Sequence, residues 1–434
     1  MRLSALYTNP IFIIIIIGFA VYFNALYCEV LNGDDALIVN YQAQVGRFGS
    51  GNVVSFLDKI VYDFLGGDNP ASYHFVNIVL HLAVCVLLFY FLKIFFPDNP
   101  SLIGALLFTI LPIHTENVTW IAGKTHILIG LSFLGTFLLF HYKKYLWALL
   151  AFTLGICPGF NQISIVNLWV GLTPIFIGVY LLIYKKSREL WKLIPFFIIF
   201  GIIASLFFFV MRERVELTAQ GYEHGVNLWV NFIYSVISHF RLMIYPAKLT
   251  RYHENVLVNF DVLAWGSAIV IALGGFSVYL YKKAKPLLLG LILFFLFLSP
   301  TYSPFPMGWV IAERYAYVPS ILLSIVVAYA ISSKYRGMAI LVCLLVFPFY
   351  GVRTVDRNAD YKTNGRFCRA NVEANLFSPK ARNDLGVAYA QESNVIRALQ
   401  AFGNALRIEP DFKDARTNLE LVEKALLQKI RIKY

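Results

Sequence analysis

Two neighbouring carboxylates stand where an apolar segment ends, and they could act as a general base. Asp34 and Asp35 occur in "NGDDALIVN", directly after an apolar run that ends near Tyr27. A carboxylate can take the proton from an attacking hydroxyl group. The alternatives are solvated loop acids or a helix cap for residues 36–44.

Three further segments carry cations that could stabilise an anionic leaving group. They read "LPIHTENVTWIAGKTHIL", "YPAKLTRYHEN" and "AERYAYVPS". Their candidate substrate-binding residues are His114, Glu116, Lys124, Arg251, Tyr252, Glu313 and Arg314, with His126, Lys248, His253 and Glu254 beside them. The structural alternatives are anchoring at the membrane interface, a local Glu313–Arg314 ion pair and a polar surface loop.

Other familiar chemistries have no support in the sequence. It contains no Gly-rich phosphate loop, no HExxH and no GxSxG, which argues against soluble nucleotide chemistry and zinc proteolysis. Two adjacent carboxylates could hold Mg²⁺ or Mn²⁺, but we favour a reaction without a metal and expect no cofactor.

The composition is that of an integral membrane protein. Of 434 residues, 59% are hydrophobic and 14% are charged, whereas soluble proteins have about 25% charged residues. We therefore do not interpret the net charge of +12 as affinity for nucleic acid. Cys28 and Cys368 are expected on one face, with a bond between them left open.

The apolar runs predict an all-α protein with about eleven transmembrane helices. The expected spans are residues 10–27, 75–96, 102–112, 126–141, 146–156, 163–184, 193–210, 262–281, 286–303, 318–332 and 338–351.

Short Lys/Arg clusters then alternate with longer, chemically mixed loops, as the positive-inside rule requires. All candidate site residues fall on the opposite, outer face. Residues 225–245 predict a helix at the interface or along a cavity, with a twelfth span as the alternative.

The end of the chain predicts a soluble domain on that outer face. We expect domains at 1–352 and 353–434. "ARNDLGVAYAQESNVIRALQAFGNALRIEPDF" matches the 34-residue tetratricopeptide (TPR) pattern. Gly386 and Ala398 would let two helices approach, Tyr389 and Phe402 would fill the seam, and Pro410 would end the second helix. Residues 366–376 and 413–429 predict flanking helices.

Six features follow one another along the chain: "NGDDALIVN", "YHFVNIVLHL", "LPIHTENVTWIAGKTHIL", "YPAKLTRYHEN", "AERYAYVPS" and the TPR. In this order they resemble the TMTC-type O-mannosyltransferases and their prokaryotic relatives, within the GT-C glycosyltransferase superfamily. The resemblance implies a GT-C-like membrane domain and an inverting transfer from a polyprenyl-phosphate sugar to a hydroxyl group of an acceptor protein. Asp34 or Asp35, with a slight preference for Asp34, would be the base.

Arg314 and Lys124 would stabilise the leaving phosphate with help from His114, while Glu116 and Glu313 would orient these groups or bind sugar hydroxyls. Two places depart from the family pattern. An Arg-Pro pair is missing, with Arg47 as the nearest basic substitute, and Asn161-Gln162 replaces a Lys-Glu pair.

The expected location is a bacterial inner membrane, an archaeal cell membrane or the endoplasmic reticulum, with the TPR on the periplasmic, extracellular or lumenal side. A TPR there could dock an acceptor protein. The alternatives are transfer to a glycolipid or polysaccharide, a TPR-bearing membrane scaffold without activity and, more distantly, a transporter.

Overall fold

The computed structural model describes residues 9–36, 38–39, 61, 65, 69–156, 165–220, 228–253, 260–302 and 309–433. Across these ranges the chain is helical and contains no strand, as predicted. The helices of the membrane part are α2 (Pro10–Tyr22), α5 (Pro70–Lys93), α6 (Asp98–Ile110), α7 (Thr115–Val118), α8 (Lys124–His141), α9 (Tyr145–Ile156), α10 (Leu172–Ile183), α11 (Ile194–Gln220), α12 (Leu228–Ile244), α13 (Phe260–Lys283), α14 (Lys285–Leu298), α15 (Ile321–Ser332) and α16 (Arg336–Asp360).

Seven helices in the described ranges are long and apolar enough to cross a membrane, or eight if the bent pair Asp98–Ile110 and Pro112–Val118 is one span. Four shorter apolar helices accompany them: Tyr145–Ile156, Leu168–Ile183, Leu228–Ile244 and Ile321–Ser332. A multi-pass membrane protein is therefore supported, and the count of eleven spans stays a prediction.

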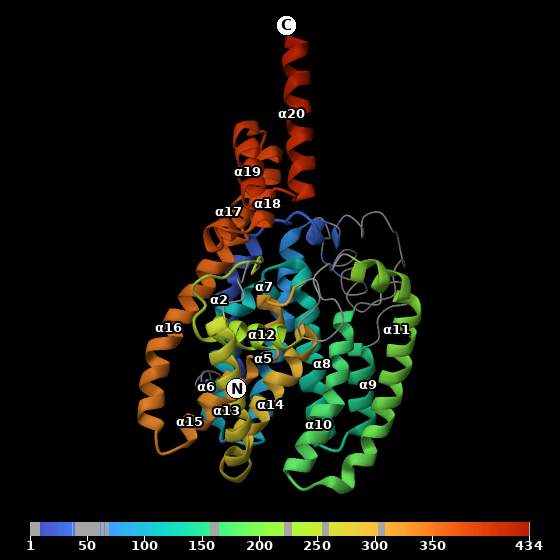
Figure 1. The fold of residues 1–434 in the computed structure, drawn as a ribbon. Coiled ribbons are helices and arrows are strands. Elements are labelled where there is room, and N and C mark those ends of the chain that lie inside the picture. Colours follow the sequence, from blue (N-terminus) through green and yellow to red (C-terminus); the bar gives the residue numbers. More distant parts are fainter. Residues whose placement is uncertain are drawn as a thin grey trace.

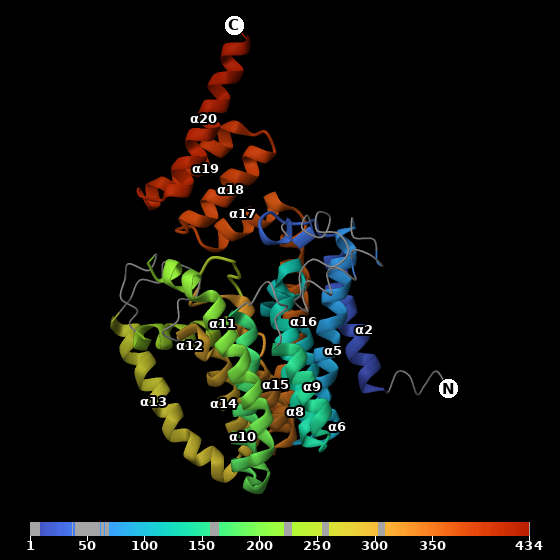
Figure 2. The ribbon, with the colours of Figure 1, turned by 90° about the vertical axis from the view of Figure 1, so that its right-hand side faces the viewer.

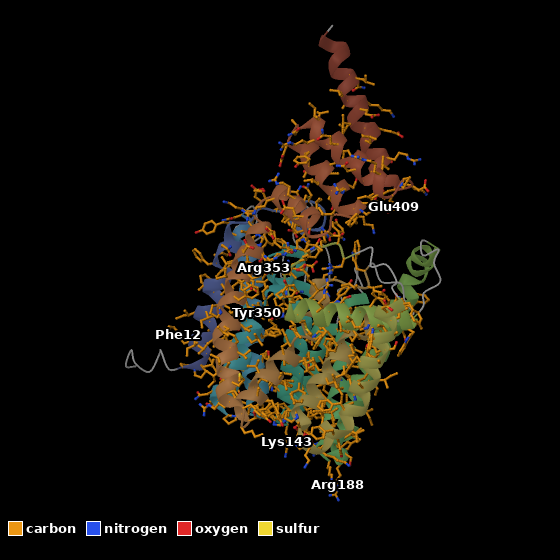
Figure 3. All side chains as sticks on the ribbon, turned by 60° about the vertical axis from the view of Figure 1, so that its left-hand side comes forward. Phe12, Lys143, Arg188, Tyr350, Arg353 and Glu409 are labelled. Carbon is orange, nitrogen blue, oxygen red and sulfur yellow. The ribbon has the colours of Figure 1, made fainter. Side chains whose placement is uncertain are left out.

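The two ends of the helical bundle differ in their charges. Lys143 and Arg188 lie at one end, whereas Arg353 and Glu409 lie toward the other (Figure 3). The α13–α14 turn, which directly follows Lys282 and Lys283, and the α15–α16 connection, which carries Lys334, lie at the same end as Lys143 (Figures 1 and 3). This separation agrees with the predicted alternation of basic and mixed loops.

Helix α12 lies across the long helices rather than alongside them (Figures 1 and 2). It packs against α13, against the turn Ser299–Tyr302 (η6) and against the turn Glu313–Ala316 (η7). Its side chains Ser235 and His239 are buried in that contact. This arrangement fits the predicted interfacial helix better than a twelfth span.

The helices that carry the site pack closely because small residues stand at their crossings. Helix α6 contacts α5 and α15. A Cβ atom on Gly104 of α6 would come within 2.7 Å of the Ser324 carbonyl oxygen in α15, which real Cβ atoms do not reach. A larger residue at Gly104 would push the two helices apart and move the residues at their outer ends.

Helix α16 passes without a break through the domain boundary predicted at residue 353. It leads into α17 (Asn364–Ala374), α18 (Pro379–Gln391), α19 (Val395–Ile408) and α20 (Lys413–Lys433). These four helices rise above the bundle (Figure 2). A Cβ atom on Gly386 would lie 2.5 Å from the Phe402 ring, so Gly386 does permit the close α18–α19 contact.

Candidate active site at one end of the helical bundle

The predicted site segments, far apart in the sequence, converge beneath α17 and α18. Asp34 lies in a helical turn after η1 (Phe23–Tyr27), and its Oδ2 atom is 3.2 Å from Nη2 of Arg251. The Arg251 guanidinium lies 4.9 Å from the ring centre of Trp120, and the Arg314 guanidinium lies 5.9 Å from the same ring. Trp120 therefore holds two cations near one exposed carboxylate.

Asp34 and Asp35 differ sharply in their surroundings. The Asp34 side chain is 51% exposed, whereas Asp35 is fully buried. The Asp35 carboxylate accepts hydrogen bonds from the backbone N–H of Ala122, at 2.9 Å, and of Leu31, at 3.4 Å. Burial raises the pKa of Asp35 to about 7, although these backbone N–H groups and the Lys124 charge oppose the rise.

Glu116 holds Arg314 at two points. Oε1 of Glu116 is 2.6 Å from Nη1 of Arg314, and Oε2 accepts the Arg314 backbone N–H at 2.8 Å. The Glu116 side chain is 3% exposed and that of Arg314 is 13% exposed. This geometry suits the orienting role that the resemblance implies for Glu116.

Glu313 pairs with a residue that the sequence analysis missed. Its Oε1 atom lies 3.4 Å from Nη2 of Arg357 and 3.6 Å from Nε2 of His253. Arg357 is fully buried near the end of α16, where it also contacts Asp360 at 3.1 Å. The local Glu313–Arg314 pair is therefore not formed, because each residue has a partner from another element.

Arg357 could have been found from the sequence. The apolar run 338–351 continues into "RTVDRNAD" without a helix breaker. A domain boundary at 353 placed this Arg in a soluble segment. A charged residue one or two turns beyond an apolar run also suits the buried end of the same helix.

Lys124 and His114 are both buried, but their contacts differ. The Lys124 Nζ atom lies 5.9 Å from the Tyr73 ring centre, and its charge acts on Asp35. The His114 ring contacts the Phe108 carbonyl oxygen at 2.9 Å and the Ser320 hydroxyl at 2.8 Å. Both ring nitrogens of His114 are thus engaged, which leaves none for a substrate in this arrangement.

The helices after α16 hold the loop that carries Arg251. The Asn371 Oδ1 atom on α17 accepts the Arg251 backbone N–H at 2.9 Å and the Thr250 hydroxyl at 3.1 Å. The Tyr252 hydroxyl donates to the Asp384 carboxylate on α18. Tyr252 therefore connects the loop to α18 instead of facing an open site.

Near the first outer loop, the Asn32 side chain likewise donates to Gln391 on α18 at 2.6 Å. Both loops that supply the exposed Asp34–Arg251 pair are thus fixed by the same helices. Cys28 and Cys368 are free thiols buried in one apolar cluster. Three predicted features lie outside the described residues: Glu254, Arg47 and the Asn161-Gln162 pair.

The arrangement has the parts that a transfer reaction needs. Asp34 is accessible to a hydroxyl group from outside, and Arg251 and Arg314 can both approach an anion beside Trp120. Arg is suited to bidentate contact with phosphate. Asp35 and Glu116, in contrast, are occupied in fixing the polypeptide around these groups.

Comparison with known proteins identifies relatives of the same kind. The human protein O-mannosyl-transferase TMTC3 is 26% identical over 414 residues, which cover 81% of this chain and 44% of that protein. Protein O-mannosyl-transferase Tmtc3 of Drosophila melanogaster is 24% identical over 446 residues, covering 81% of this chain and 47% of that protein.

A shorter segment is more similar. The human protein O-mannosyl-transferase TMTC1 is 43% identical over 77 residues, which are 17% of this chain and 9% of that protein. No family model and no solved structure matches the chain.

This chain spans less than half the length of the TMTC3 relatives that it matches. Over its main part, the chain is a distant homologue of the TMTC-type protein O-mannosyl-transferases.

Proposed function

We propose that this chain is a membrane glycosyltransferase that transfers a sugar, mannose by analogy with its relatives, from a polyprenyl-phosphate donor to a hydroxyl group of an acceptor protein. The observation that carries the proposal is the exposed Asp34 carboxylate paired with Arg251, with Arg314 on the same Trp120 ring. The homology to protein O-mannosyl-transferases supports this reaction class.

In this mechanism Asp34 is the general base. The acceptor hydroxyl attacks the anomeric carbon, its proton passes to the Asp34 carboxylate, and the bond from the anomeric carbon to the phosphate oxygen breaks. Asp35 has a pKa near 7, which would suit a base. A general base must first lie within hydrogen-bond distance of the proton that it accepts, and its pKa matters only after that. The buried Asp35 already accepts hydrogen bonds from two backbone N–H groups.

The leaving polyprenyl phosphate is stabilised by Arg251 and Arg314. Arg251 can release the half-exposed Asp34 when an anion arrives, because an exposed ion pair contributes only about 0–1 kcal/mol. Arg314 stays oriented by Glu116. The Lys124 charge acts on Asp35, and Lys124 does not need to touch the donor.

Helices α17–α20 are the proposed TPR domain. The α18–α19 pair has the predicted close contact at Gly386, and Ala398, Phe402 and Ala405 are buried in its seam. Because α17 and α18 contact the loops of Asp34 and Arg251, an acceptor bound to this domain would lie beside the base. We propose that this end of the bundle faces the periplasm, the cell exterior or the lumen.

The proposal is tested by reconstituting the full chain in nanodiscs with polyprenyl-phosphate mannose and peptides derived from secreted proteins. We expect a mass increase of one hexose on Ser or Thr, and no increase with polyprenyl phosphate alone. Intact-mass glycoproteomics of cells with and without the chain identifies natural acceptors. A sugar transferred to lipid but never to peptide would favour the glycolipid or polysaccharide reaction instead.

A further inference from the structure

His126 is a buried histidine whose ring nitrogens have no partner in the described part of the chain. It lies in the first turn of α8, two residues after Lys124, and is 6% exposed. Neither Nδ1 nor Nε2 has a hydrogen-bond partner among those residues. An unsatisfied buried polar group costs about 1–3 kcal/mol, so such a group in a native protein requires an explanation.

The side chains around His126 form a small cavity. Its lining residues are His126, Ile129, Trp169, Phe297, Tyr315, Val318 and Pro319. The ring centres of His126 and Trp169 are 5.4 Å apart, and those of His126 and Tyr315 are 5.5 Å apart. The Trp169 indole N–H also lacks a partner within the described ranges. Two polar groups of different elements are therefore unsatisfied at the same cavity.

The cavity adjoins the cationic part of the active site. The Arg314 guanidinium lies 4.9 Å from the Tyr315 ring centre, and Tyr315 is one of the residues that line the cavity. The other walls, Ile129 and Phe297 among them, are apolar. A ligand there would meet polar groups beside Arg314 and apolar groups deeper in the bundle.

The size of the cavity limits its occupant. It has room for about one water molecule, which is too small for a sugar ring. One oxygen atom of a phosphate group fits this space, and the imidazole and the indole N–H are both hydrogen-bond donors. A phosphate group that enters from the Arg314 side with one oxygen atom therefore matches the size of the cavity and its donors.

We propose that His126 and the indole N–H of Trp169 bind the phosphate of the lipid-linked donor from the membrane side of Arg314. This inference rests on the proposed function and gives His126 the assisting role that the sequence suggested for His114. His126 is a binding residue here and transfers no proton.

The experiment measures the binding of two lipids to the full chain in detergent: polyprenyl phosphate, and uncharged polyprenol of the same length. His126→Phe keeps an aromatic ring and removes both nitrogens. We expect it to weaken polyprenyl-phosphate binding about tenfold, since hydrogen bonds to a charged group are stronger than neutral ones, and to leave polyprenol binding unchanged. Trp169→Phe should have a similar but smaller effect.

Two further variants separate binding from folding. His141→Phe makes the same change at the opposite end of α8, where His141 contacts the Tyr180 hydroxyl, and should alter neither affinity. His126→Asn restores one donor and should recover part of the phosphate affinity. A folded His126→Phe protein that binds polyprenyl phosphate within twofold of wild type would show that the cavity holds only water.

Lipid binding and sugar transfer are measured separately, so the His126 site and the proposed function are tested independently. If the wild-type protein binds polyprenyl phosphate through His126 but transfers no sugar to any acceptor, the phosphate site stands and the transferase activity is overturned. If the wild-type protein binds polyprenyl phosphate no better than polyprenol, the His126 site is overturned.

Discussion

The exposed rim of the site (Asp34 and Arg251) and its buried interior (Glu313 and Arg357) both contain a carboxylate–Arg pair, but the two regions are built differently. At the rim, Asp34 is half-exposed and meets Arg251 through one contact of 3.2 Å. In the buried interior, Glu313 and Arg357 are both fully buried, and each contacts a second ionisable residue.

This difference assigns different tasks to similar residues. The rim pair contributes little to stability and can separate when substrate arrives. A buried pair leaves an uncompensated charge when one partner is removed, at a cost of about 3–5 kcal/mol. The buried Glu313–Arg357 pair is therefore expected to hold η7 (Glu313–Ala316), and with it Arg314, against α16. The rim residues perform the reaction.

The largest effect is expected from Asp34→Asn at the rim. Loss of the general base should slow sugar transfer about 10²- to 10⁴-fold, with little change in the unfolding temperature. The measurement is single-turnover transfer to a peptide in nanodiscs. Asp98→Asn is the matched control, because Asp98 is another exposed aspartate with an ion-pair partner, Lys93, on the opposite end. An active Asp34→Asn protein would return the role of base to Asp35.

In the buried interior, Arg357→Met should lower the free energy of unfolding by about 3–5 kcal/mol, because Glu313 then loses its buried partner. Unfolding followed by intrinsic fluorescence in detergent measures this effect. Lys93→Met is the control, since Lys93 pairs with the exposed Asp98 and its loss should cost no more than about 1 kcal/mol. An equal loss of unfolding free energy in both variants would contradict the distinction between the exposed rim and the buried interior.

Between these regions, Asp35 should make stability depend on pH. Its pKa is raised from 3.8 in the unfolded chain to about 7 in the folded protein, so the folded state holds one proton more between these values. Stability should then fall as pH rises from about 4 to 7, by at most about 1.4 kcal/mol per unit, and level off above.

The Asp35→Asn protein lacks this contribution, so its unfolding temperature should decline less over the same range. Unfolding of both proteins is recorded at half-unit steps of pH. Parallel curves for the two proteins would mean that the Asp35 carboxyl does not change its affinity for protons on folding.

The smallest effect is expected from Asn371→Ala on α17, which removes an acceptor for the Arg251 backbone N–H. A net loss of about 1 kcal/mol in local stability should speed amide exchange of residues 248–253 and slow transfer a few-fold. Asn404→Ala on α19 is the control. Unchanged exchange in the Asn371→Ala protein would show that α17 does not fix this loop.

The sequence was sufficient for the class of protein and for most of its elements. Apolar runs and Lys/Arg clusters predicted a helical membrane protein with the candidate residues at one end, because length and charge act locally on each segment. Helices α17–α20 agree with the predicted helical segments after residue 353, since Gly386 and Pro410 act through local sterics.

Sequence reasoning could not identify partners that come from distant parts of the chain. Glu313 and Arg314 are adjacent, which suggested a local pair, but their partners are Arg357 and Glu116. His114 was expected to assist the cations; its ring contacts Phe108 and Ser320, whereas the ring nitrogens of His126 have no partner in the described ranges. Which histidine is satisfied depends on the packing of α6, α8 and η7.

The sequence by itself determined the chemistry that this protein carries: an acidic pair, several cations and an apolar chain to hold them at a boundary. Only the tertiary structure decided the difference between Asp34 and Asp35. Adjacent residues on a helical turn point in different directions, so one carboxylate meets solvent and Arg251 while the other is enclosed by backbone N–H groups. Burial follows from distant segments packing together, which no local pattern specifies.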